Sequence, residues 1–218
     1  MVGKAVLGRG QEGCLEALTK ARERMPFPWC EVHPDNDSSF INWHLVRYCE
    51  EEGITLSRSR PYKKNDNCFV EEKNKTHVRA VLGHLRYDSD REQAVINGLY
   101  RYELRLYKNF FQPVMKLTRK IREKGKVHRR YDTPRTPYQR LMESEQIPDE
   151  TKNELAKVYQ LLNPAELKRN IDQRLQELFH IYQEKEGTVT ASRSKRHTPQ
   201  VRTQSYLLNG RTTPASVT

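Results

Sequence analysis

The first 85 residues alternate strand-like segments with amphipathic stretches of helical period, and this alternation restricts the unit to folds that combine helices with strands. The strand-like segments are 29–33 and 54–57, and the helical ones are 12–25, 41–52 and 69–82. Pro26 and Pro28 stop the first helix, whereas Gly53 and Gly83 follow the other two. Residues 57–67 are polar and basic and are interrupted by proline, which predicts a loop.

From about residue 88 the apolar spacing is helical throughout. One stripe consists of Val95, Leu99, Tyr102, Leu106 and Phe110, and Pro113 terminates it. A second stripe runs over 155–182, and Asn163 offers a helix N-cap within it. The two halves of this second stripe predict a helical hairpin that ends near residue 185. The residues beyond Gly187 are rich in Ser, Thr, Arg and Pro, which predicts a disordered basic tail over 186–218.

The charge of the chain favours a polyanionic partner. Lys and Arg number 39 against 28 Asp and Glu, which gives a net charge of +11 and a pI near 9.5. Residues 116–140 hold ten Lys or Arg and two acids, so they are predicted to form an exposed basic connector. Charge alone is also compatible with an ordinary basic protein that binds no nucleic acid.

Cysteine usage and hydropathy bear on the compartment. The four cysteines contain no CxxC pair, so the pattern indicates free thiols in a reducing compartment and no zinc ribbon. No run of 18 apolar residues is present. We therefore expect a soluble, cytoplasmic protein without membrane association.

Two carboxylates stand where a metal site would need them. Asp35 follows a predicted strand, Glu71 begins a predicted helix, and 35 residues separate them. Two-metal phosphoryl transfer requires carboxylates from separate elements to converge, because both ions share oxygen ligands. The spacing by itself is a weak signal, since most acidic residues are exposed on the surface.

The residues around the two acids carry a resemblance to a known family. Residues 33–42 read HPDNDSSFIN and residues 60–74 read RPYKKNDNCFVEEKN. Both resemble, in order and in register, the two signature motifs of the DDE-type transposase and integrase catalytic core, in particular that of bacterial insertion-sequence transposases. Residues 107–113 and 131–138 look like the region that follows the core in these transposases. The resemblance covers about residues 1–185.

This resemblance implies an α/β fold: an incomplete RNase H-like core over 1–85, an α-helical region over 86–185 and the tail. It makes Asp35 and Glu71 the second and third carboxylates of the catalytic triad, ligands to two Mg²⁺ or Mn²⁺ ions in strand transfer on DNA. The residues implied to contact DNA are Arg58, Arg60, Lys63, Lys64, Asn74 and Lys75. The implied partners are transposon ends and target DNA, and a homo-oligomer or a full-length transposase, in a nucleoid-associated setting.

The chain departs from the family pattern in two ways. The 34 residues before Asp35 contain no Asp, so the first carboxylate is missing from this segment and the chain alone is expected to be inactive or badly impaired. Asp37 and Ser39 replace the glycine and the glutamate of the first motif. His33 is expected to orient its neighbours and not to bind Mg²⁺, which prefers oxygen.

Two other functions compete with catalysis. A DNA-binding remnant would use the basic loop and residues 116–140, and its affinity would fall steeply with salt. An assembly fragment would turn the stripes at 95–110 and 155–182 towards a partner, although the pattern favours packing within the chain as a helical hairpin. The aromatic residues near 100–111 are expected in the core, with base stacking as the alternative.

Overall fold

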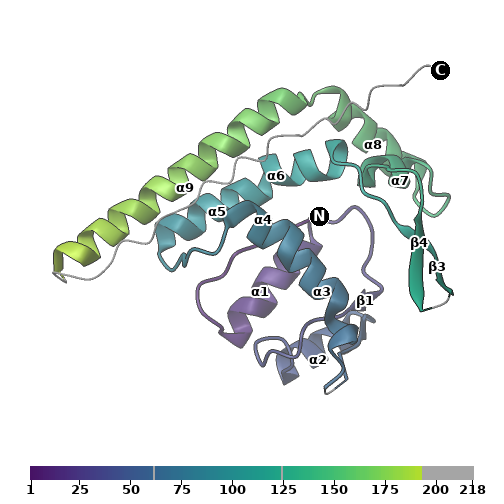
Figure 1. The fold of residues 1–218 in the computed structure, drawn as a ribbon, viewed down its shortest axis with the longest axis horizontal. Coiled ribbons are helices and arrows are strands. Elements are labelled where there is room, and N and C mark those ends of the chain that lie inside the picture. The colour runs from purple at the N-terminus through teal and green to yellow at the C-terminus, as the bar shows by residue number, and fades with distance from the viewer. Residues whose placement is uncertain (61, 124, 193–218) are drawn as a thin grey trace, which may run out of the picture.

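The computed structural model describes residues 1–60, 62–123 and 125–192, apart from the side chains of Lys64 and of residues 188–192. A group of helices around a small sheet lies beside a layer of long helices, and a β-hairpin projects from one end of that layer (Figure 1). The described residues form two two-stranded sheets. The fold is therefore a mixture of helices and small sheets.

The N-terminal unit packs two helices against a parallel strand pair. It consists of α1 (Gln11–Arg22), β1 (Glu31–Val32), α2 (Trp43–Glu51) and β2 (Thr55–Leu56). The Thr55 amide donates to the Cys30 carbonyl at 3.0 Å, and the Ser57 amide donates to the Val32 carbonyl at 3.1 Å. Val32, Leu45, Cys49 and Ile54 form the buried core between these elements. All four elements were predicted, although each is shorter than the sequence suggested.

Helix α2 illustrates how local residues set the limits of an element. The Asn42 side chain accepts a hydrogen bond from the Leu45 amide at 3.1 Å and so caps the first turn. Gly53 follows the helix with φ of 64°, a conformation that favours glycine and that ends the helix as predicted. The chain can therefore turn at once into β2.

A helix from Cys68 to Leu82 connects the two parts of the molecule. The short 3₁₀ turn η1 (Lys64–Asn67) leads into α3 (Cys68–Lys73), which continues as the π-helical η2 (Asn74–Arg79) and then as α4 (Ala80–Leu82). Gly83, with φ of 74°, closes it. The predicted helix over 69–82 is confirmed, whereas its π-helical middle was not foreseen.

The long helical layer holds the main core. α5 (Asp90–Arg101), α6 (Glu103–Leu106) and the π-helical η3 (Tyr107–Phe111) follow one another, and α9 (Pro164–Ser192) runs antiparallel beside them (Figure 1). Leu99 and Leu178 belong to the same core, with 0% and 1% of their surface exposed. The two predicted stripes thus pack against each other within the chain.

The remaining two helices join the layer through stacked aromatic rings. α7 (Pro137–Met142) and α8 (Asp149–Gln160) lie near η3. The Tyr138 ring lies 5.1 Å from that of Phe110 and 4.8 Å from that of Tyr159. These aromatic residues serve packing, and Tyr100 is likewise buried, whereas Tyr102 is half exposed.

Three expectations for the C-terminal half were wrong. The local hairpin over 155–185 does not form as predicted, because α9 packs on α5 and α6 while α8 packs on α7. The helix also continues through Gly187 to Ser192, so the predicted tail does not begin at 186, and residues 193–218 lie outside the described part of the chain. Third, residues 116–140 contain a β-hairpin where a connector was expected.

A β-hairpin occupies most of the segment that was expected to be a connector in an all-helical region. β3 (Leu117–Glu123) pairs antiparallel with β4 (Lys126–Tyr131), and Gly125 in the turn adopts φ of 81°. Its strands are exposed along nearly their whole length, as predicted for this basic segment. The strands were missed because they bury no face and therefore lack the alternation of apolar residues that indicates a strand.

Among the described helices, none is both long enough and apolar enough to cross a membrane.

Candidate functional site

Asp35 and Glu71 occupy the positions relative to secondary structure that the motifs predicted. Asp35 lies three residues beyond the end of β1 and is partly exposed. Glu71 lies in the first turn of α3 and is exposed. Neither carboxylate forms an ion pair with another described side chain, so both have oxygens available for a ligand.

A chain of polar contacts joins the elements that carry these two acids. His33 Nδ1 lies 2.7 Å from Ser57 Oγ, and His33 Nε2 lies 3.4 Å from Ser59 Oγ. The Ser59 hydroxyl donates to Asn67 Oδ1 at the start of α3. The contacts therefore hold the end of β1, the end of β2 and the beginning of α3 together, two residues before Asp35 and four before Glu71.

The proton positions in this cluster follow from its donors. Ser57 Oγ donates its only proton to Glu31 Oε1, so it must accept a hydrogen bond from His33 Nδ1. Because the neutral ring then presents an acceptor at Nε2, the Ser59 hydroxyl, which is 1% exposed, shares its single proton between Asn67 Oδ1 and His33 Nε2. His33 therefore acts as a structural link between strands, as expected. No local pattern singled out Ser57, Ser59 or Asn67, because their contacts depend on the folding of β1 against β2.

The two residues that depart from the first motif pair with each other. Asp37 Oδ1 accepts hydrogen bonds from the Ser39 amide, at 2.9 Å, and from the Ser39 hydroxyl, and these bonds hold the pKa of Asp37 below its usual value. The Asp37 amide in turn donates to Asp35 Oδ1 at 3.2 Å. The backbone of Asp37 does not take a positive φ, so this turn does not require the glycine that stands at this position in the motif it resembles. Asp35 keeps Oδ2 outside these bonds.

The basic loop before α3 is braced by one of the predicted DNA-binding residues. Arg60 Nε and Nη2 donate to the two carboxylate oxygens of Asp66 at 2.8 and 3.0 Å. This paired contact lowers the pKa of Asp66 to about 2 and raises that of Arg60. Arg60 is thus engaged within the loop. Arg58 and Lys63 are exposed, and the side chain of Lys64 lies outside the description.

Asn74 and Lys75 were predicted to share a helix face with Glu71. Both are exposed, but they open the π-helical η2, in which the turn is wider than in an α-helix. The i+3 and i+4 spacing that placed them under Glu71 therefore does not apply unchanged. Single π-helical turns within α-helices occur frequently at functional sites.

Across the described chain, no three His, Cys, Asp or Glu side chains gather in a way that could hold a metal ion. Asp35 and Glu71 are therefore not part of a larger cluster of these side-chain types. Mg²⁺ is commonly held by one or two carboxylates and completes its shell with water and substrate phosphates. The chemistry of the two acids fits such an ion.

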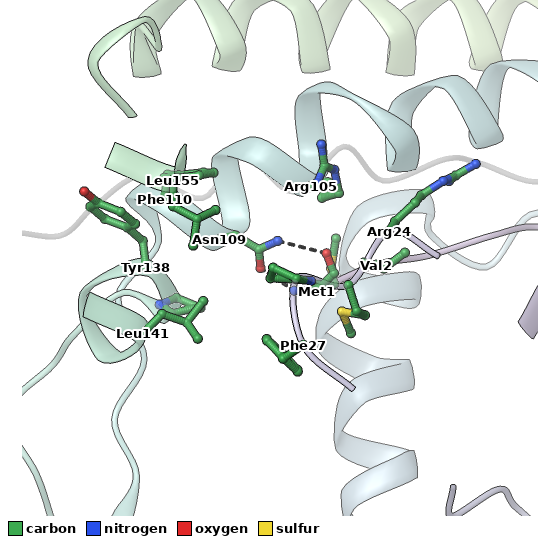
Figure 2. A pocket seen from close by; sticks show the side chains of 13 residues that line it. Met1, Val2, Arg24, Phe27, Arg105, Asn109, Phe110, Tyr138, Leu141 and Leu155 are labelled. Atoms are coloured by element: carbon green, nitrogen blue, oxygen red, sulfur yellow. Dashed lines mark hydrogen bonds between the residues drawn. The ribbon is translucent and has the colours of Figure 1, made fainter. Parts of the chain in front are cut away.

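A cavity of about 190 Å³ lies elsewhere, between residues 24–27, η3 and the helices α7 and α8 (Figure 2). Asn109 donates to the Met1 carbonyl at 2.9 Å and accepts from the Met1 amino group at its edge. Burial, together with the charges of Arg105 and Lys73, lowers the pKa of that amino group to about 6. The described residues that line the cavity are mostly apolar and include no carboxylate, so it is not the metal site.

Comparison with known proteins leaves the family undetermined. No family model matches the chain. A protein of Sinorhizobium fredii named "Uncharacterized protein y4rM" is 41% identical over 126 residues, which is 58% of this chain. The match spans 36% of the length of that protein, so the chain covers about a third of the curated relative it matches.

Proposed function

We propose that the chain takes part in DNA transposition or integration, with Asp35 and Glu71 as ligands of the divalent ions of a DDE-type strand-transfer site. The observation that carries this proposal is the Ser59 contact, which ties the strand end that precedes Asp35 to the helix start that precedes Glu71. Because one or two protein carboxylates, with water and substrate phosphates, commonly hold Mg²⁺, two carboxylates on adjoining elements would be enough.

The residues around the pair have separate roles in this proposal. Asp35 is presented by a turn that Asp37 and Ser39 stabilise, and Glu71 is presented by the first turn of α3. Arg58 and Lys63 would neutralise phosphates of the bound DNA, while Arg60 keeps the loop in shape through Asp66. When bound, Mg²⁺ or Mn²⁺ would activate the attacking hydroxyl and stabilise the leaving oxygen.

Metal affinity tests the proposal without requiring catalysis. The full chain is titrated with Mn²⁺, and free Mn²⁺ is measured by electron paramagnetic resonance for the wild type, Asp35→Asn and Glu71→Gln. Each substitution should weaken binding at least about tenfold, since loss of an outer-shell partner alone commonly costs that much. Glu72→Gln is the matched control, because Glu72 is an exposed neighbour on the same helix. It should leave the affinity within about twofold of the wild type, a change that corresponds to about 0.4 kcal/mol.

Two results would refute the proposed site. One is an affinity in Asp35→Asn and Glu71→Gln that equals the wild-type value. The other is a loss in Glu72→Gln as large as the loss in Glu71→Gln, because Mn²⁺ would then be responding to the general negative charge of α3 and not to a defined ligand pair.

A further inference from the structure

We infer that the β3–β4 hairpin is a DNA-binding ribbon that inserts into the major groove of duplex DNA. The inference concerns a different part of the molecule from Asp35 and Glu71 and does not depend on their binding a metal.

The hairpin is built without a buried face. Of the described residues in β3 and β4, Ile121 alone is partly buried, and the others are exposed. The two strands make their main contacts with each other and project away from the helical layer (Figure 1). Isolated two-stranded hairpins are only marginally stable in water. Packing among the residues that the structure describes therefore does not account for the hairpin.

Cationic side chains lie directly opposite one another across the two strands. Arg119 lies opposite Arg130, and Lys120 lies opposite Arg129. Like charges directly opposite each other destabilise a strand pair, because their Cβ atoms are only about 4.5–5.5 Å apart. Since neighbouring residues on a strand point to opposite faces, these two pairs make both faces of the ribbon cationic. A polyanion in contact with both faces would relieve the repulsion.

The base of the hairpin, in contrast, is firmly held. Arg140 on α7 donates to Asp132 Oδ2 at 2.7 Å and to the Val114 carbonyl at 2.9 Å. Asp132 Oδ1 accepts from the Lys116 amide at 2.6 Å, and Val114 pairs with Arg135 through two backbone hydrogen bonds. The ribbon is therefore anchored to the body at one end and open to solvent over the rest of its length.

The dimensions favour B-form DNA as the partner. The major groove of B-DNA is about 12 Å wide and about 8.5 Å deep and admits a two-stranded ribbon. Strands lie about 4.8 Å apart, and the seven residues of β3 extend for about 20 Å. Duplex RNA offers the same charge, but its major groove is too narrow and deep for side chains to enter. A ribbon that inserts into the major groove will bind duplex DNA more tightly than duplex RNA, whereas a general basic surface will bind both with similar affinity.

The test uses the full chain and a mixed-sequence 30-base-pair DNA duplex, with binding followed by fluorescence anisotropy across a salt series. The hairpin variant carries Arg119→Gln, Lys120→Gln, Arg129→Gln and Arg130→Gln. Its control carries Lys4→Gln, Arg47→Gln, Lys157→Gln and Arg169→Gln, four exposed cations outside the hairpin. The hairpin variant should bind at least about tenfold more weakly, and the slope of log affinity against log salt should fall by about 3 to 4, at about 0.9 for each lost phosphate contact. The control should lose less than about threefold in affinity, a change that corresponds to about 0.7 kcal/mol.

A second measurement needs no substitution and so does not depend on how the variants fold. An RNA duplex of the same length competes for the wild-type chain, and insertion predicts that it competes at least about tenfold less well than DNA. Equal competition by RNA and DNA would overturn the inference, as would a control variant that loses as much affinity as the hairpin variant.

Discussion

Lys185→Met is expected to lower the free energy of unfolding by about 2 kcal/mol, because it removes the cation that balances a buried carboxylate. Glu92, at 0% exposure, accepts hydrogen bonds from Lys185 Nζ at 2.9 and 3.1 Å. It also accepts from the amides of Asp88 and Ser89, each at 2.9 Å, in the capping box of α5. This cluster joins the start of α5 to the far end of α9.

The magnitude follows from the surroundings of the pair. Removal of one partner from a fully buried ion pair costs about 3–5 kcal/mol. Lys185 retains 24% exposure, and Glu92 keeps its bonds to Asp88 and Ser89, so a value near the lower end or below it is expected. For a chain of this size, about 2 kcal/mol corresponds to a fall in Tm of about 4–8 °C.

Urea unfolding at pH 7, followed by far-ultraviolet circular dichroism, measures this cost. A double-mutant cycle with Glu92→Met isolates the pair, since replacement of both partners by apolar side chains is often neutral. The coupling energy should reach at least about 1 kcal/mol. A cost below about 0.5 kcal/mol for Lys185→Met, or strictly additive effects in the cycle, would refute the reasoning.

The pair also predicts a dependence on pH. Burial works against ionisation of Glu92, but hydrogen bonds from Lys185 and Ser89 outweigh it and hold its pKa below the ordinary value of 4.5. A carboxylate with a lowered pKa contributes its full stability above its unfolded pKa and loses it as the pH falls through the folded value. The difference between wild type and Lys185→Met should therefore be largest near pH 7 and narrow below pH 4.5.

Three further substitutions test other parts of the fold. Leu178→Ala should destabilise the chain by about 3 kcal/mol in urea unfolding, since its side chain fills the core beneath α5. Gly125→Ala should destabilise the folded hairpin by about 1–2 kcal/mol, because φ of 81° is unfavourable for alanine. Faster amide hydrogen exchange in the hairpin would show this loss. Gly3→Ala should lower Tm by several degrees, because its Cβ would lie 2.3 Å from Tyr100 Cδ1, whereas Gly10→Ala meets no atom within 4 Å and should not.

Sequence patterns predicted the helices of this fold well, because a helix that buries one side carries a periodic apolar stripe. The stripe at 167–182 became the buried face of α9, and Asn163 caps that helix through the amides of Ala165 and Glu166. A stripe does not identify its partner, however. The pairing of α9 with α5 and α6 in place of α8 depends on shape and on contacts such as that between Arg174 on α9 and Glu103 on α6 at 2.9 Å, which no local pattern reveals.

The positions of the two candidate carboxylates could also be predicted from sequence patterns, whereas the contacts around them could not. The motifs placed Asp35 after a strand and Glu71 at a helix start, and both positions are confirmed. The contacts that bring these elements together were not predictable, since His33 lies 26 residues from Ser59 in the sequence and meets it only in the folded chain. Likewise, the motif that predicts a DNA contact for Arg60 does not reveal its pairing with Asp66.

The antiparallel contact between α5 and α9 has a consequence for synthesis on the ribosome. Leu99 and Leu178 are buried in the same core, yet about 80 residues of chain separate them. At translation rates of about 5–20 residues per second, the apolar side of α5 remains uncovered for about 4–16 s before the α9 segment is synthesised. During that interval the nascent polypeptide exposes apolar surface to solvent. Early release or a translational pause between these two leucines should therefore favour capture by chaperones or aggregation.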